Sequence, residues 1–180
     1  MKGETPARRW TNPPATIDDP DRSIWTIVAE PGERHGLHAM YSDDNAPPPT
    51  VTRGNRTAWQ IGPASAEKSR LYFAVQHPDF GMGKTPRVVL TVEYFDEGKG
   101  TVELEYDSSD PAVRKITGKP GAFKTHPTRL TLTDSGTWNT ARFVIADAEF
   151  SNRCNARDFR LNVSNQAALI LRSVGITLAD

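Results

Sequence analysis

The sequence predicts an all-β fold, an antiparallel two-sheet β-sandwich with jelly-roll connections. Many short segments alternate between apolar and polar residues, which is the pattern of a strand with one buried face. The chain has 14 prolines and 13 glycines, which separate these segments with turns. No segment of convincing length shows the period of an amphipathic helix. A chain of 180 residues built from short strands without helices is expected to bury its apolar faces between two packed sheets.

Four candidate strands precede the longest alternating segment. Each ends at proline, glycine or a polar turn signal. The proline-rich stretch between the second and third strands is expected to be a loop, because it suits neither a helix nor a central strand. The four segments are SIWTIVAE (23–30), GLHAMYS (36–42), TAWQIG (57–62) and SRLYFAVQH (69–77).

The segment from Thr85 to Asp110 has the clearest pattern in the chain. Two alternating runs meet at a Gly-Lys-Gly turn, which predicts a long antiparallel hairpin. One face is apolar and is expected to join the core, whereas the other is rich in carboxylates. The apolar face comprises Val88, Leu90, Val92, Tyr94, Val102, Leu104 and Tyr106.

The remaining third of the chain predicts four more strands after an irregular connection. Residues 111–127 contain glycines and prolines that interrupt any regular element, so they are expected to be irregular. The predicted strands are two within 128–150 around the turn Asp134-Ser135-Gly136, one in ARDFRLNVSN (156–165) and a closing strand in AALILRSVGITLAD (167–180).

The domain organisation is expected to be simple: a flexible N-terminal arm over residues 1–22 and one sandwich domain over residues 23–180. Lys and Arg total 22 and Asp and Glu total 22, so the formal charge is zero. That balance argues against a nucleic-acid partner, which favours a basic surface. No apolar run approaches the roughly 18 residues of a membrane span, and the first residues lack the apolar core of a signal peptide.

The single cysteine, Cys154, has no internal partner for a disulfide. Its neighbours match no nucleophile signature. We therefore expect a partly buried, inert thiol.

Two motifs resemble a known family. They are TVEYFDEGKGTVELEYDSS (91–109) and FSNRCNARDFRL (150–161), within a matching region that runs from about Leu71 to Leu178. Together they resemble the β-jelly-roll accessory domains of bacterial polysaccharide-degrading enzymes, commonly classed as carbohydrate-binding modules. Where the family pattern suggests a pair of glycines, this chain has Ala156-Arg157.

The resemblance implies a non-catalytic domain that binds a polysaccharide and brings an attached carbohydrate-active enzyme to its substrate. It also implies a monomer, an appended catalytic domain, and a secreted or periplasmic location. Domains of this kind often carry a structural calcium ion. The oxygen ligands available for calcium are Asp96 at the predicted hairpin and Asp107 and Asp110 after it.

Sugar-binding sites use aromatic rings for stacking and Arg, Asn, Asp or Glu for paired hydrogen bonds to hydroxyls. Trp59 is the first aromatic candidate because its neighbours are polar. The polar strand faces and the densest polar loop supply the rest. The predicted ligand-binding residues are Trp59, Glu93, Glu103, Glu105, Arg142, Asn152, Arg153, Asn155 and Arg160.

Each of these signals has a plain structural alternative. Acids and arginines on neighbouring strands form cross-strand ion pairs on any solvated sheet. Asn and Asp are frequent in turns for local reasons. Two further functions stay open: a small β-sandwich lyase or hydrolase acting on an anionic polysaccharide, and a purely structural accessory domain.

Overall fold

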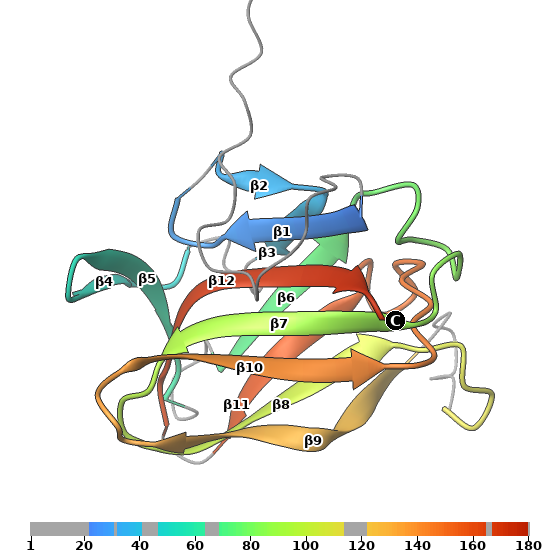
Figure 1. The fold of residues 1–180 in the computed structure, drawn as a ribbon. Coiled ribbons are helices and arrows are strands. Elements are labelled where there is room, and N and C mark those ends of the chain that lie inside the picture. Colours follow the sequence, from blue (N-terminus) through green and yellow to red (C-terminus); the bar gives the residue numbers. More distant parts are fainter. Residues whose placement is uncertain are drawn as a thin grey trace, which may run out of the picture.

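The computed structural model describes residues 22–30, 32–40, 47–63, 69–113, 122–164 and 167–179. It confirms the predicted fold class, because two antiparallel sheets pack face to face and none of these residues forms an α-helix (Figure 1). The described ranges accordingly contain no helix long and apolar enough to cross a membrane. The predicted N-terminal arm lies, except for its last residue, outside the described residues.

We call the sheet nearer the viewer in Figure 1 sheet A and the other sheet B. Sheet A follows the order β10 (Trp138–Ile145), β7 (Val88–Phe95), β12 (Leu169–Leu178), β1 (Ser23–Ile27) and β2 (Arg34–His35), with β5 (Arg56–Ile61) also paired to β12 and β4 (Thr50–Arg53) paired to β5. Sheet B follows the order β3 (Leu37–Met40), β6 (Arg70–Val75), β11 (Phe159–Ser164), β8 (Lys99–Asp107) and β9 (Phe123–Thr133).

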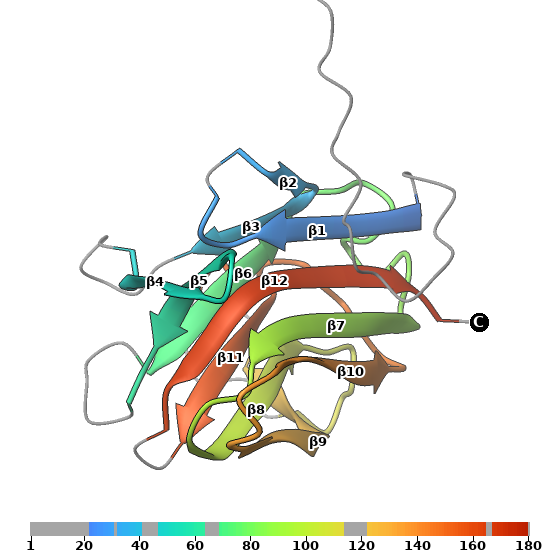
Figure 2. The ribbon, with the colours of Figure 1, turned by 60° about the vertical axis from the view of Figure 1, so that its left-hand side comes forward.

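The predicted hairpin is the main error of the sequence interpretation. Strands β7 and β8 do not pair: β7 lies between β10 and β12 in sheet A, and β8 lies between β11 and β9 in sheet B (Figure 2). The chain crosses from one sheet to the other between Phe95 and Lys99. Both strands nevertheless bury the apolar faces that alternation predicts, so these faces meet across the core instead of side by side.

Two strands extend into segments expected to be irregular. Strand β4 follows the proline-rich loop, and β9 begins at Phe123. In β9 the register with β8 shifts where His126, Pro127 and Thr128 face Leu104, which forms a bulge. The His126 ring replaces ladder contacts there, since Nδ1 accepts from the Thr128 amide at 3.1 Å and Nε2 lies 3.0 Å from the Val144 carbonyl of sheet A.

The core lies between the inward faces of the two sheets and contains most of the large apolar side chains. Phe73 of β6 and Phe159 of β11 stack with their ring centroids 4.6 Å apart, and both are fully buried. This pair lies directly beneath the outward face of sheet B. The backbone of β6 and β11 is thereby fixed under the polar side chains on the other side.

Candidate functional site

The outward face of sheet B brings together side chains from strands far apart in the sequence. We call this surface the B face. One row runs straight across all five strands, because the register aligns Met40, Tyr72, Arg160, Glu105 and Thr125. Side chains at these positions point away from the core, since their neighbours along each strand point into it.

Arg160 is the centre of this row. Its Nε and Nη2 donate to the two carboxylate oxygens of Glu105 at 2.6 and 3.0 Å, which is a bidentate ion pair. Its Cζ lies 4.6 Å from the centroid of the Phe123 ring and 5.7 Å from that of Tyr72. The guanidinium therefore forms one layer with two aromatic rings that are themselves 6.4 Å apart.

The electrostatics of this cluster keep Arg160 charged and fixed. Burial disfavours the charge on Arg160, but the hydrogen bonds and charge of Glu105 outweigh it, and the pKa of Arg160 is above its usual range. Arg160 Nη1 also lies 3.3 Å from the Tyr72 hydroxyl oxygen. The cluster is thus an ordered surface, in which Tyr72 and Phe123 stay partly exposed to solvent.

A second polar row flanks the first. Arg70 Nε donates to the Asn162 Oδ1 at 3.3 Å, and Arg129 Nη2 lies 2.9 Å from the Glu103 carboxylate. The two rows together form a strip of planar hydrogen-bonding groups with aromatic rings inside it. Rings that stack on apolar faces and planar groups that bind paired hydroxyls are the chemistry suited to a hydroxyl-rich ligand.

The B face unites part of the predicted ligand-binding set. Glu103, Glu105 and Arg160 lie in neighbouring positions on it, as expected for strands that share a sheet. Glu93 and Arg142 do not, because β7 and β10 belong to sheet A and their side chains point out of the opposite side of the sandwich.

Glu93 is a structural group in sheet A. It is 4% exposed, and its carboxylate accepts from Arg56 Nη1 at 2.6 Å and from the Ser173 hydroxyl at 2.8 Å. Arg142 is exposed and forms no ion pair with the described residues. Glu93 and the predicted glutamates of β8 therefore lie on different surfaces of the sandwich.

Trp59 is also not on the B face. It belongs to the core cluster and is 4% exposed, because β5 turns this position inward. A ring that is so deeply buried cannot stack along a polysaccharide on the sheet surface. It does form part of a small pocket, described below.

The polar loop after β10 is held by buried aspartates. Asp107, which is 1% exposed, accepts from Arg153 Nε at 3.0 Å, from Arg153 Nη2 at 2.8 Å and from the Ser151 amide at 2.9 Å. Asp158 accepts from the amides of Asn152 and Val75 at 2.7 Å each. Arg153 thus has a structural partner in Asp107. The side chains of Asn152 and Asn155 are exposed, and their contact with a ligand stays a prediction.

Four of the loop's non-glycine residues have positive φ angles, and Ala156 is one of them at 58°. This is a position where the family pattern suggests glycine. The left-handed region costs a non-glycine residue about 1–2 kcal/mol, which a glycine at the same position would not lose. Part of this advantage is offset, because glycine has more conformational freedom in the unfolded chain. We expect Ala156→Gly to raise the free energy of unfolding by about 0.5–1 kcal/mol. Urea unfolding measures this, with Ala146→Gly, outside the positive-φ set, as a control that should not stabilise.

Each of the three predicted calcium ligands is engaged by other groups, and calcium binding stays a prediction. Asp96 is 2% exposed and accepts from the amide and hydroxyl of Thr133 and from the amides of Asp134 and Ser135. Burial opposes its charge, but these bonds lower its pKa to about 2. Asp107 is paired with Arg153 and Asp110 with Lys124. The described ranges hold no group of three or more His, Cys, Asp or Glu side chains that could bind a metal ion.

Cys154 is buried in an environment that keeps its thiol protonated. Its side chain is 3% exposed, and burial, aided by the charge of Asp107, raises the pKa of the thiol to about 12. A protonated, buried thiol is unreactive at neutral pH. The burial expected from the sequence is confirmed, and the low reactivity stays a prediction.

Sequence reasoning missed the two aromatic rings of the B face. Tyr72 belongs to the polar set of an alternating strand, and this pattern was the available signal that it faces outward. Phe123 lies in a segment expected to be irregular, so nothing indicated that it shares a sheet with Arg160. Both rings are placed by pairings between strands that are distant in sequence.

Comparisons with known proteins identify a similar fold. No protein-family model and no curated protein matches the sequence. Among solved structures, the fold is similar to a xylan-binding module CBM15, at 13% identity over 88% of this chain and 97% of that one, with a TM-score of 0.47. The likeness concerns the arrangement of the β-strands alone.

Proposed function

We propose that this chain is a carbohydrate-binding domain and that a polysaccharide lies along the B face. The observation that carries the proposal is the layer formed by Arg160, Tyr72 and Phe123, with Glu105 holding the guanidinium in place. A pyranose ring has an apolar face for the two aromatic rings and hydroxyl pairs for the flanking planar groups. The flat and open geometry suits one segment of a long chain better than a small enclosed molecule.

Binding of this type is expected to be reversible and moderate in affinity. Each hydrogen bond to a solvated hydroxyl replaces one to water, so its net contribution is small. The proposal includes an attached or associated polysaccharide-active enzyme, whose local concentration at the substrate the domain would raise. We also propose that the domain is a monomer and that it acts in a secreted or periplasmic location. The support for the associated enzyme, the monomeric state and the location is the family resemblance of the two sequence motifs.

Binding should be tested by affinity electrophoresis on soluble polysaccharides and by pull-down on insoluble ones. The panel covers neutral, uronate-bearing and sulfated chains, each with and without EDTA. Wild type is expected to bind one class without releasing sugar ends. Tyr72→Ala should weaken that binding by about tenfold, because it removes one stacking ring.

Two variants serve as controls. Tyr72→Phe keeps the ring and should bind nearly as wild type, whereas Arg142→Gln changes a charge on the opposite face and should bind as wild type. Unchanged affinity in Tyr72→Ala would place the ligand elsewhere. Release of new sugar ends would make the domain an enzyme, and loss of binding in EDTA would show a required metal ion.

A further inference from the structure

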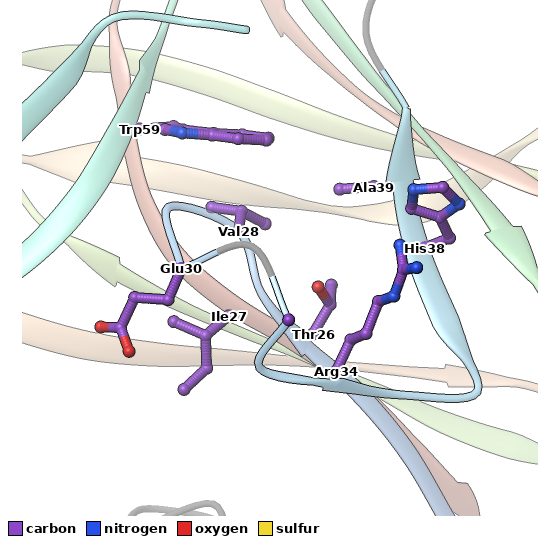
Figure 3. Close-up of a pocket in the computed structure, with 9 residues that line it drawn as sticks. Thr26, Ile27, Val28, Glu30, Arg34, His38, Ala39 and Trp59 are labelled. Atoms are coloured by element: carbon purple, nitrogen blue, oxygen red, sulfur yellow. The ribbon is translucent and has the colours of Figure 1, made fainter.

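A small pocket lies where the edges of the two sheets are joined. The segment 34–40 pairs with β1 at Arg34 and with β6 from Leu37 onward, so it links sheet A to sheet B. Beside it the structure has a cavity of about 170 Å³ (Figure 3). A cavity of about 150 Å³ holds a benzene ring, so this one has room for a carboxylate and one edge of the sugar ring that carries it. Its lining residues are Thr26, Ile27, Val28, Glu30, Gly32, Arg34, His38, Ala39 and Trp59.

The two sides of the pocket differ in chemistry. Figure 3 shows Trp59 and Val28 on one side and the Arg34 guanidinium beside the His38 ring on the other. Among the described residues Arg34 has no ion-pair partner. The lining carboxylate, Glu30, points away from that pair and lies 3.3 Å from Arg172 Nη1. The pocket therefore offers an apolar, aromatic wall facing a positive charge, and no carboxylate of the described residues pairs with that charge.

The pocket adjoins the B face. His38 and Met40 lie on the same side of β3, and Met40 is paired with Tyr72 of the central row. Two residues along a strand span about 7 Å, which is the separation of His38 from Met40 along β3. Tyr72 lies on the neighbouring strand, directly opposite Met40. A side branch of a chain on the B face can reach this distance.

We infer that this pocket binds a uronic acid group of the polysaccharide that lies on the B face. The inference rests on the proposed function and names its ligand class, an acidic polysaccharide. The planar guanidinium of Arg34 fits a planar carboxylate with two parallel hydrogen bonds. The apolar wall made by Trp59 and Val28 exposes only a small area, because the two side chains are 4% and 3% exposed, so it fits one edge of the sugar ring next to the carboxylate.

His38 gives the interaction a pH dependence. Burial, with the positive charges of Arg34 and Arg157, lowers its pKa, and Glu30 on the far wall is paired with Arg172. A bound carboxylate favours the protonated ring, so binding takes up a proton. Affinity for the acidic chain should therefore rise as the pH falls through and below about 6.5, the ordinary pKa of histidine, and affinity for a neutral chain should not.

The test compares a uronate-bearing polysaccharide with its carboxyl-reduced form on the same domain. Wild type should bind the acidic form about tenfold more tightly, the size of one charge-assisted contact. Arg34→Gln should reduce this preference to about one without changing affinity for the reduced form. Arg34→Lys should keep part of it, and Arg142→Gln, which removes the same charge on the other face, should keep all of it.

The outcomes separate the pocket from the B face. Equal affinity of wild type for the two forms, or a preference that survives Arg34→Gln, would overturn the inference while Tyr72-dependent binding stands. Addition of free glucuronate should shift the NMR signals of the backbone amides around Thr26 and His38, and Arg34→Gln should abolish these shifts. Such shifts would support the pocket even if no polysaccharide binds. Absence of polysaccharide binding would contradict the proposed function instead. Equal shifts with glucose would also overturn the inference.

Discussion

Replacement of Asp107 by asparagine is expected to lower the free energy of unfolding by about 3 kcal/mol. The Asp107 carboxylate is 1% exposed and accepts hydrogen bonds from the Arg153 side chain and the Ser151 amide. Asparagine keeps the shape but loses the charge, and its amide NH2 faces donors instead of accepting from them. The guanidinium of Arg153 is left without its counter-charge in a partly buried position.

Urea unfolding followed by tryptophan fluorescence measures this loss as a fall in the transition midpoint. Glu103→Gln is the matched control, since it neutralises a carboxylate in the same strand whose partner, Arg129, is largely exposed. Such a pair is worth at most about 1 kcal/mol. An equal fall in the free energy of unfolding in the two variants would show that the buried Asp107–Arg153 pair stabilises the fold no more than an exposed ion pair does.

Asp158 is expected to make the domain less stable as the pH rises from about 4 to about 6. Burial, with the negative charge of Asp107, raises the pKa of Asp158 from 3.8 to about 6, although two backbone amides partly oppose the shift. In that interval the folded state binds more protons than the unfolded state, so stability falls with increasing pH. A shift of about 2 pKa units corresponds to roughly 3 kcal/mol across the interval.

The comparison of wild type with Asp158→Asn isolates this contribution. The variant cannot titrate at this position, so its stability should change less between pH 4 and pH 6, even if it is less stable throughout. Equal pH slopes for wild type and Asp158→Asn would show that Asp158 titrates normally.

Asp96 affects the pH dependence of stability in the opposite direction. Its pKa of about 2 gives stability that is present above pH 4 and lost as the pH falls toward 2.

Alternation in the sequence predicted which side chains face the core, but it predicted neither which strands pair nor that the outward residues Val89, Thr91 and Glu93 of β7 are buried as well. The inward residues of β7 and β8 agree with the pattern in full. The hairpin was wrong because a two-residue period defines a face and leaves the neighbour undefined. Each strand instead pairs with partners that come later in the chain, such as β12 for β7 and β11 for β8.

The residues of the candidate site were likewise predictable from the sequence only in part. Arg160 and Glu105 were foreseeable as polar residues of strands in one sheet, whereas Phe123 was not. Its strand was hidden by Pro127, which reads as a strand breaker. The structure accommodates this proline in a bulge, where it needs no ladder hydrogen bond. Local sequence rules do not foresee such an arrangement because the opposing strand determines it.

The position of β12 bears on how the domain is made by the ribosome. This strand lies at the centre of sheet A, with β7 on one side and β1 and β5 on the other. Its residues, 169–178, are translated after every strand that they join. Strands β1, β5 and β7 are therefore synthesised well before their shared partner, and the backbone N–H and C=O groups on their edges toward β12 have no ladder partner until it is made. Sheet A therefore cannot be completed before residue 178 has been translated, because its central strand is made after all the strands that it joins.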